Sequence, residues 1–486
     1  MFGLMEITAS LNEPIKLAII PTVVLPLTVV GMILTSVATW VAALFGIQLK
    51  AEGPKRIFEV LMKPKVLLLA LLSNLLVYGA ISAGKYVLAG PYPLWWVHFQ
   101  NSPARTTNLQ YENTLTPTNS LTETSPKVAS ATISSVDLVW ENNLKELIFA
   151  SPQVTGNSLF AGTQNGRLIE VDLENGKVIR KFEIGKPVMT SPTFWQQKIY
   201  AGEGVHDTHH ARLYSFDLKS GAFLKAFQTQ GHIERSAVVA HIADRAVLLA
   251  PAGKDGLYAI DPVTMEKIWQ APVGHVDSHP LADSERVYVG TGLEMGYAET
   301  ATKVFSLNIQ TGAIVWEKYL PTSSWGIPAF WKDKICFGVG DVYKNTHYGQ
   351  LTCYDRQTGQ EYFAFNTTGA LISQPTVTGD HLIVSDLYGK IYQFNLHTKS
   401  LDWTISVPTR NESYASVVLD SQDRLILPGI EGLYIYSRQN QNLLFTWKPT
   451  TKENAPWKGT FSNVVFFKDL WILADKEGVL RALRIK

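Results

Sequence analysis

Cysteine and net charge are both scarce in this 486-residue chain. Two cysteines, Cys336 and Cys353, are too few for a fold built on a disulfide framework, and they are not adjacent in the sequence. The 43 basic and 42 acidic residues leave a formal charge of +1, whereas nucleic-acid binding requires a basic face. We therefore expect no nucleic-acid partner.

Motifs of the common enzyme classes are missing as well. The sequence contains no nucleophile elbow, no phosphate-binding glycine loop and no pair of carboxylates at catalytic spacing. The scattered glycines are explained by turns. We therefore expect no catalytic residues and no resident cofactor.

Long apolar runs are present, and they predict a transmembrane helical hairpin within residues 1–97. No charged residue lies between Lys16 and Lys50, and this run is well beyond the roughly 20 residues that cross a bilayer. A second run starts at Val66, which gives predicted helices at about 17–47 and 66–88. The alternative is a cleaved signal peptide, which has a shorter apolar region behind a basic leader; the leader here carries Glu6 and Glu13.

Basic residues set the orientation of the hairpin. They gather between the two runs, at Lys50, Lys55, Arg56, Lys63 and Lys65. The positive-inside rule places this loop in the cytoplasm, so the N-terminus and everything after Trp96 lie outside it. For a bacterium this predicts an inner-membrane protein with a periplasmic domain. The hairpin is either a plain anchor or a docking surface, in which a partner helix would satisfy Asn74.

Residues 98–135 are rich in Ser, Thr, Asn and Pro and contain few large apolar side chains. Such a segment cannot bury enough surface to order itself, so we predict a flexible linker between the membrane region and the rest of the chain.

One short unit recurs through the remainder of the chain. Lys303–Trp316 reads KVFSLNIQTGAIVW, a β-rich run, a turn on Thr311-Gly312 and a second run that ends in Trp. Related stretches begin at Arg212, Gly256, Gln350 and Lys390, about 45 residues apart. A pair of residues whose second member is Pro or a small residue marks the start of each of eight units; the first members of these pairs are Ser151, Ser191, Ser236, His279, Ile327, Gln374, Ala415 and Ser462.

Each unit contains four short runs, which is the content of one β-propeller blade. We therefore predict an all-β, eight-bladed β-propeller with four-stranded blades over residues 136–486, preceded by the two-helix transmembrane hairpin. The eighth unit ends after its third strand, and an orphan strand at Val136–Asn143 carries Trp140 at the fourth-strand position. We predict that this N-terminal strand completes the last blade and closes the ring.

The turn between the third and fourth runs has its own chemistry. Gly supplies a positive φ, while the Asx and Thr side chains bond the local backbone. The aromatic residue after this turn keeps the same strand parity in every copy, so these rings should pack between blades: Phe182, Phe227, Trp269, Trp316, Phe363, Trp403 and Phe445.

These features resemble the PQQ-like (quinoprotein-type) propeller repeat family. The resemblance is carried by Leu257-Tyr258-Ala259-Ile260-Asp261 and by Thr311-Gly312 to Trp316. It implies an eight-bladed propeller outside the cytoplasm, in one of two branches. One branch is the quinoprotein dehydrogenases; the other is non-enzymatic scaffolds such as the propeller of the outer-membrane β-barrel assembly machinery.

The scaffold branch is favoured. Dehydrogenases of the family carry two adjacent cysteines against the cofactor and long insertions around the pocket, whereas the units here are near minimal length. Members of the scaffold branch are anchored to the membrane by a lipid-modified N-terminal Cys. In this chain we expect the two predicted helices to provide the anchor instead. We therefore expect a membrane-anchored periplasmic scaffold for protein interaction, with other envelope proteins as partners. The alternative is a quinone- or metal-dependent periplasmic oxidoreductase that uses PQQ or a divalent metal.

The cysteines fall on the second and third strands of the fifth blade. If Asn165-Gly166 forms a two-residue turn in the first blade, the same register places Cys336 and Cys353 on opposite faces of the sheet. We therefore predict two free, mostly buried thiols.

Histidines gather on the connections of three adjacent blades. Loops between second and third strands share a face with the connections that enter the next blade, and there the sequence places six histidines: His206, His209, His210, His232, His275 and His279. Imidazoles with nearby carboxylates suit zinc or copper, but the spacing matches no fixed motif. The simpler interpretation is an exposed polar rim, and a pH-sensitive contact surface is a third. An interaction face at the mouth of the channel would also include Asp207, Arg235, Asp277, Trp325, Gln374 and Tyr414.

Overall fold

The computed structural model describes residues 133–206, 208–293, 301–342, 346–407, 415–429, 431–449, 457 and 459–486. The predicted membrane helices and nearly all of the predicted linker lie outside these residues. Among the residues it describes, none belongs to a helix long and apolar enough to span a membrane.

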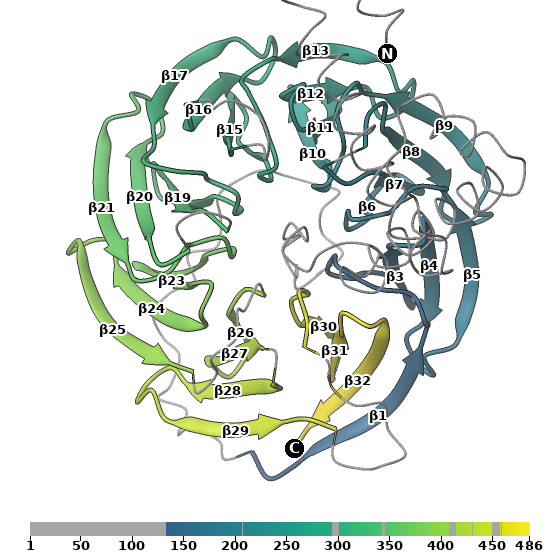
Figure 1. The fold of residues 1–486 in the computed structure, drawn as a ribbon, viewed down its shortest axis with the longest axis vertical. Coiled ribbons are helices and arrows are strands. Elements are labelled where there is room, and N and C mark those ends of the chain that lie inside the picture. The colour runs from purple at the N-terminus through teal and green to yellow at the C-terminus, as the bar shows by residue number, and fades with distance from the viewer. Residues whose placement is uncertain are drawn as a thin grey trace, which may run out of the picture. The chain divides into compact units, whose positions relative to one another are not determined.

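The described residues form eight four-stranded antiparallel sheets in a closed ring (Figure 1). The first two blades are β2 (Gln153–Thr155), β3 (Ser158–Thr163), β4 (Arg167–Asp172) and β5 (Val178–Glu183), then β6 (Thr193–Trp195), β7 (Lys198–Gly202), β8 (Arg212–Asp217) and β9 (Phe223–Gln228). The third and fourth are β10 (Val238–Ile242), β11 (Arg245–Pro251), β12 (Leu257–Ile260) and β13 (Lys267–Ala271), then β14 (Leu281–Ala282), β15 (Arg286–Gly290), β16 (Lys303–Asn308) and β17 (Ile314–Tyr319).

The same order of strands continues around the ring. The fifth and sixth blades are β18 (Ala329–Trp331), β19 (Lys334–Gly340), β20 (Gly349–Asp355) and β21 (Glu361–Thr367), then β22 (Thr376–Thr378), β23 (His381–Ser385), β24 (Lys390–Asn395) and β25 (Ser400–Ser406). The seventh consists of β26 (Val418–Leu419), β27 (Arg424–Pro428), β28 (Leu433–Ser437) and β29 (Leu443–Trp447). The predicted eight-bladed, all-β architecture is confirmed.

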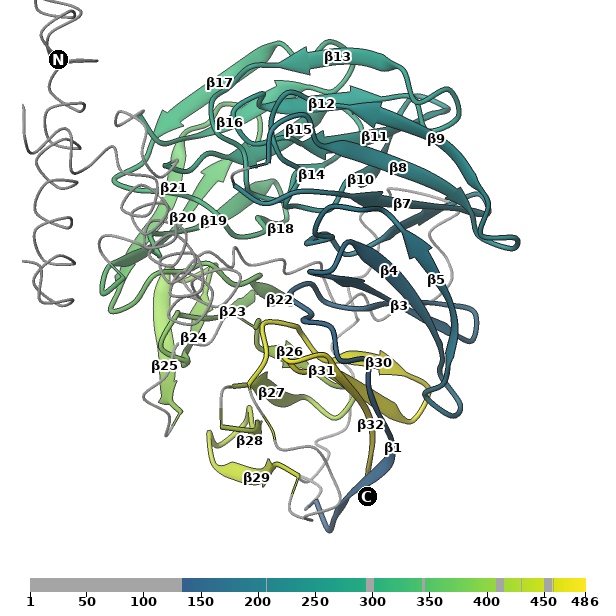
Figure 2. The ribbon, with the colours of Figure 1, turned by 45° about the vertical axis from the view of Figure 1, so that its right-hand side comes forward.

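The last blade is made from both ends of the propeller. It contains β30 (Val465–Phe467), β31 (Leu470–Ala474) and β32 (Val479–Ile485), and its outer strand is β1 (Val136–Asn143). β1 pairs antiparallel with β32 from Val136↔Ile485 to Asn143↔Val479, and the two strands lie side by side in both views (Figure 1 and Figure 2). The prediction that an N-terminal strand closes the ring is confirmed.

The hydrophobic core is divided among the blade interfaces. Eight clusters of buried side chains within the described part of the chain each combine residues of two neighbouring blades. The seven aromatic residues predicted to pack between blades all belong to these clusters or pack against them, which confirms the prediction. Burial of apolar surface between blades therefore holds the ring together.

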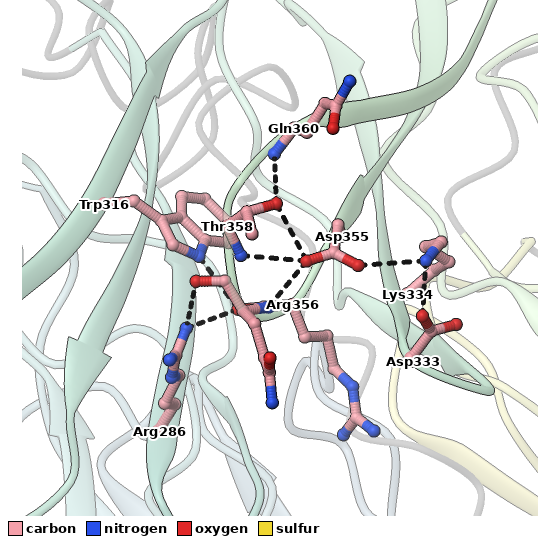
Figure 3. Close-up of polar contacts among 9 residues, drawn as sticks. Arg286, Trp316, Asp333, Lys334, Asp355, Arg356, Thr358 and Gln360 are labelled. Carbon is pink, nitrogen blue, oxygen red and sulfur yellow. Dashed lines mark hydrogen bonds and ion pairs between the residues drawn. The ribbon is translucent and has the colours of Figure 1, made fainter.

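Trp316 shows how one blade is joined to the next (Figure 3). Its indole Nε1 donates a hydrogen bond of 2.9 Å to the carbonyl oxygen of Arg356, in the Thr-Gly turn of the following blade. Arg286 donates to the same oxygen at 2.7 Å. The turn ends at Gly359, whose φ is +68°, and a Cβ there would lie 2.8 Å from Trp316 Cδ2. Gly is therefore needed both for its φ and for the close approach of the indole.

The side chain of Asp355 organises the same turn (Figure 3). Its Oδ1 accepts hydrogen bonds from the Thr358 backbone N at 2.9 Å and from the Thr358 Oγ1 at 2.9 Å, while its Oδ2 pairs with Lys334 Nζ at 3.0 Å. Asn308 accepts the corresponding bonds from Thr311 in the fourth blade, at 3.0 Å and 3.2 Å. The predicted turn chemistry is confirmed in both blades.

The two cysteines form a disulfide, so the prediction of free thiols is wrong. They are direct partners on β19 and β20, with their Cα atoms 4.0 Å apart. The error lies in the assumed loop of the first blade. Thr163 pairs with Arg167 there, so Gln164, Asn165 and Gly166 all belong to the connection. Because side chains alternate along a strand, this difference of one residue moved Cys353 to the wrong face in the prediction.

Candidate functional site

One face of the ring carries the connections from the second to the third strand of each blade and those from each blade to the next. We call it the long-loop face, because the connections β7–β8 (between Gly202 and Arg212), β15–β16 (between Gly290 and Lys303) and β19–β20 (between Gly340 and Gly349) contain more residues than the other connections within their blades. The opposite face carries the short turns within blades. Loops on a rigid scaffold are common binding sites, so the long-loop face is the candidate binding face.

Four side chains from three of these connections meet in one buried group, which we call the histidine cluster. His206 lies between β7 and β8, His232 between β9 and β10, and His275 and Asp277 between β13 and β14. One potential ligand atom from each residue lies within 4.8 Å of those of the other three. None is more than 9% exposed, so the cluster is shielded from solvent.

The carboxylate of Asp277 lies among the three imidazoles. Its Oδ1 is 3.0 Å from His232 Nε2, and its Oδ2 is 2.6 Å from His275 Nε2. His206 Nδ1 lies 3.8 Å from the same Oδ2. The centroids of the three rings are 5.0 to 5.6 Å apart. The arrangement brings several nitrogen donors and one oxygen donor towards a common point.

A second carboxyl group, that of Glu234, borders the cluster. It is 1% exposed, and its Oε1 lies 3.7 Å from His206 Nδ1. Within the described part of the chain, neither of its oxygens has a hydrogen-bond partner. A buried polar group without hydrogen bonds costs about 1–3 kcal/mol, so this position needs an explanation.

Small residues let the three connections approach one another. A Cβ at Gly202, the last residue of β7, would lie 2.4 Å from Ile233 Cγ2, so only Gly admits the segment that carries His232. Gly253, in the β11–β12 connection, forms a β-bridge with Val276, the residue between His275 and Asp277. Its φ is +51°, and a Cβ would lie 2.7 Å from His232 Cε1. Gly253 therefore leaves room for the His232 ring and also pairs with the segment that carries His275.

Burial and mutual charge shift the pKa values of the cluster. Burial lowers the pKa of His206 to about 3 and raises the pKa of Glu234 to about 8. Burial also opposes the charged forms of His232 and Asp277, but their attraction outweighs it: the pKa of His232 is raised, and that of Asp277 is held well below its usual value by His275 and His232.

The prediction of an exposed polar rim is wrong for most of its residues, because these connections fold inward and pack on one another. His206, His232, His275, His279, Arg235, Asp277 and Trp325 are all buried. Gln374 is half-buried, and its backbone N donates to Ser416 Oγ at 2.8 Å. His209 and His210 are exposed and lie outside the cluster. Asp207 and Tyr414 lie outside the described residues.

A repeated pattern in the sequence marks the residues of the cluster. His232-Ile233-Glu234 and His275-Val276-Asp277 repeat one His-x-acid pattern at equivalent positions of consecutive blades. In an extended segment, residues i and i+2 point to the same side, and the residue between them points away. Ile233 and Val276 are each fully buried, as this pattern requires. The pattern therefore indicates paired imidazole and carboxylate groups facing one point.

Comparisons with known proteins agree on the propeller. The model of the family described as outer membrane protein assembly factor BamB matches residues 120–291, 209–338 and 300–445. No curated protein sequence matches significantly. The crystal structure of BamB from Moraxella catarrhalis is similar with a TM-score of 0.53 and 14% identity, over 72% of this chain and 100% of that one. The computationally designed Ika8 protein gives a TM-score of 0.56 and 13% identity, over 72% and 99%.

Proposed function

Because this chain belongs to the PQQ-like propeller family described as outer membrane protein assembly factor BamB, we propose that it is a membrane-anchored periplasmic scaffold that binds other proteins of a cell-envelope complex. The match to this family over most of the propeller is the observation that carries the proposal. The predicted hairpin at 17–47 and 66–88 is the anchor, with its short loop in the cytoplasm.

The disulfide between Cys336 and Cys353 supports the proposed location. Stable structural disulfides form in oxidising compartments such as the periplasm and are rare in the cytoplasm. This argument is independent of the basic residues that orient the hairpin, and both favour the same side of the inner membrane for the propeller.

The long-loop face supports a binding role. Its connections differ in length and composition from blade to blade, whereas the repeated turns on the opposite face are explained by packing between blades. Loops that differ from blade to blade, carried by strands that repeat the same structure, are typical of recognition sites. We propose that the partner docks on the long-loop face.

Cross-linking in native membranes, followed by detergent extraction and mass spectrometry, tests the proposal. Two charge-exchange variants keep the net charge and alter exposed residues on opposite faces: Lys254→Glu with Glu477→Lys on the long-loop face, and Lys219→Glu with Glu174→Lys on the other. We expect the long-loop variant to lose cross-linked envelope proteins and its counterpart to keep them. Deletion of residues 1–97 should release the propeller from the membrane.

The alternative, a quinone- or metal-dependent oxidoreductase, makes an opposite prediction. A dye-linked dehydrogenase assay after reconstitution with PQQ and calcium should give no turnover if the chain is a scaffold. Clear turnover, or equal cross-linking by both charge-exchange variants, would contradict the proposed function.

A further inference from the structure

The histidine cluster has a composition that the scaffold role does not explain. We propose that His206, His232, His275 and Asp277 bind one divalent transition-metal ion, of which zinc is the best match, and that this ion fastens three connections of the long-loop face together. This inference does not depend on the proposed function, since the ion would serve the same purpose in any propeller with these residues.

The donor set fits zinc better than the other common ions. Three imidazole nitrogens and one carboxylate oxygen are typical zinc ligands, and a site with four protein ligands is typical of a structural ion. Calcium and magnesium require mostly oxygen ligands. The four potential ligand atoms already lie within 4.8 Å of one another, so side-chain rotations and small shifts of the connections would bring them to bonding distance.

Glu234 gives a second, independent indication of a cation. Its buried carboxyl group faces His206, at 3.7 Å from Nδ1, and neither oxygen has a hydrogen bond among the described residues. A cation held by His206 would lie beside this carboxylate and would offset the cost of burying it.

The charges around the cluster also favour a cation. Arg235 is 1% exposed and donates through Nε to the backbone carbonyl of Asp277. Asp277 and Glu234 are therefore two buried carboxyl groups beside one buried guanidinium, and neither oxygen of Glu234 has a hydrogen bond among the described residues. A metal ion at the cluster would lie beside both carboxyl groups.

The ion would join blades that are otherwise linked by side-chain packing and backbone contacts. Its ligands come from the β7–β8 connection of the second blade, from the segment that enters the third blade and from the segment that enters the fourth. An ion that binds these connections in the folded protein and not in the unfolded chain stabilises the folded ring. The loss of the ion should therefore loosen one sector of the long-loop face.

Metal binding is tested on the full chain in detergent, purified without a polyhistidine tag and treated with a chelator. After addition of zinc and removal of the excess, elemental analysis should find about one tightly bound ion per chain. The melting temperature should rise with zinc and stay unchanged with magnesium. Cobalt, used as a spectroscopic probe, should give the visible absorption of tetrahedral coordination. Absence of retained zinc together with an unchanged melting temperature would overturn the proposal and leave a hydrogen-bonded His–Asp group.

Matched variants separate the cluster from other histidines. His206→Ala alters the most exposed ligand, whereas the combined control His209→Ala and His210→Ala alters exposed histidines of the same connection. We expect zinc affinity to fall at least about tenfold in His206→Ala and in Glu234→Gln, and to be unchanged in the control.

If His206→Ala fails to fold, Asp277→Asn provides a second variant of nearly the same shape, and its circular dichroism without metal shows whether the propeller is intact. Zinc binding that survives in the cluster variants but is lost in the His209 and His210 control would identify a surface site and contradict the proposal.

Discussion

At the scale of single residues, the glycine of the turn between the third and fourth strands of a blade has two structural roles. Gly176, Gly312 and Gly359 all have positive φ, and each lies beneath the indole of the preceding blade, at Trp140, Trp269 and Trp316 respectively. A side chain at these positions would strain the backbone and also displace a ring that joins two blades. The two costs can be separated because other turns contain a glycine in open space.

A comparison of Gly359→Ala with Gly379→Ala separates the cost of backbone strain from the cost of displacing the indole. Gly379 has a φ of +57°, and a Cβ there would meet nothing within 4 Å, so Ala should cost about 1–2 kcal/mol of backbone strain alone. Gly359→Ala adds a clash with Trp316, and we expect about 3 kcal/mol or more. Denaturant unfolding measures both. Equal costs would show that the indole moves aside freely.

Ionisation of Asp355 should make part of the free energy of unfolding depend on pH in the acid range. Its bonds from the Thr358 backbone lower its pKa to about 2; burial opposes this, and Lys334 adds to it. A carboxyl whose pKa is lower in the folded state stabilises the fold above its unfolded pKa of about 4, and this contribution is lost as the pH falls towards 2.

The variant Asp355→Asn keeps the turn, since Asn308 accepts the same bonds in the fourth blade, but loses the ion pair with Lys334. We expect a cost of about 1 kcal/mol at pH 7 that disappears by about pH 2. Melting curves of both proteins across this range measure the difference. A gap that does not narrow would exclude the carboxylate as its source.

At the scale of elements, the disulfide joins β19 to β20 inside the cluster that links the fifth and sixth blades. Cys336 and Cys353 are fully buried, and they lie on strands rather than on the long-loop face. The bond therefore stabilises a blade and has no direct contact with the histidine cluster.

Replacement of both cysteines by Ala should lower the free energy of unfolding by about 2–4 kcal/mol. When the protein is unfolded without reductant, its cysteines should not react with a thiol reagent. After reduction, both thiols should react. Reductant should leave the stability of the double variant unchanged, which controls for other effects of the reagent. Two reactive thiols in the unreduced, unfolded protein would contradict the disulfide.

At the scale of the whole molecule, β1 makes the ring continuous. Trp140 on β1 donates through Nε1 to the carbonyl oxygen of Leu173 at 2.8 Å and joins the core cluster between the last and first blades. The closing strand therefore makes the same kind of contact as the Trp residues inside the ring, at Trp269 and Trp316.

Trp140→Ala should destabilise the whole propeller by about 3–5 kcal/mol, because it removes a large buried side chain at the point of closure. Val139 is the matched control on the same strand: it is 38% exposed, and Val139→Ala should change stability by no more than about 0.5 kcal/mol. Thermal unfolding followed by circular dichroism compares them. Similar melting temperatures for the two variants would show that the ring does not depend on this contact.

The fold could be predicted from the sequence because its signals are local and repeated. The Asp or Asn that begins the turn between the third and fourth strands, and the aromatic residue that follows this turn, recur in most blades, so an error in one copy is corrected by the others. The register of Cys336 and Cys353 depended on a single loop, and the assignment of Gln164 to a strand was enough to reverse the result. Register is sensitive in this way because side chains alternate with a period of two.

The candidate site was predictable only in part. Chain topology correctly brought His206, His232, His275 and Asp277 to the same face, since it depends on strand order alone. Whether a connection folds inward depends on small residues such as Gly202 and Gly253, which admit neighbouring segments at close range. Those contacts join distant parts of the chain, so periodicity does not reveal them, and the predicted exposed rim is a buried cluster.

Ring closure by β1 also determines the order of events during synthesis. The first strand of the propeller can pair only after the last strand has been synthesised, because Val136 pairs with Ile485. Bringing these ends together in a flexible chain costs about 5 kcal/mol of loop entropy, which the blades formed in between reduce as they assemble. A chain that lacks only its final blade would form an open arc that exposes the apolar faces which otherwise pack against the eighth blade, so such incomplete chains should be prone to aggregate.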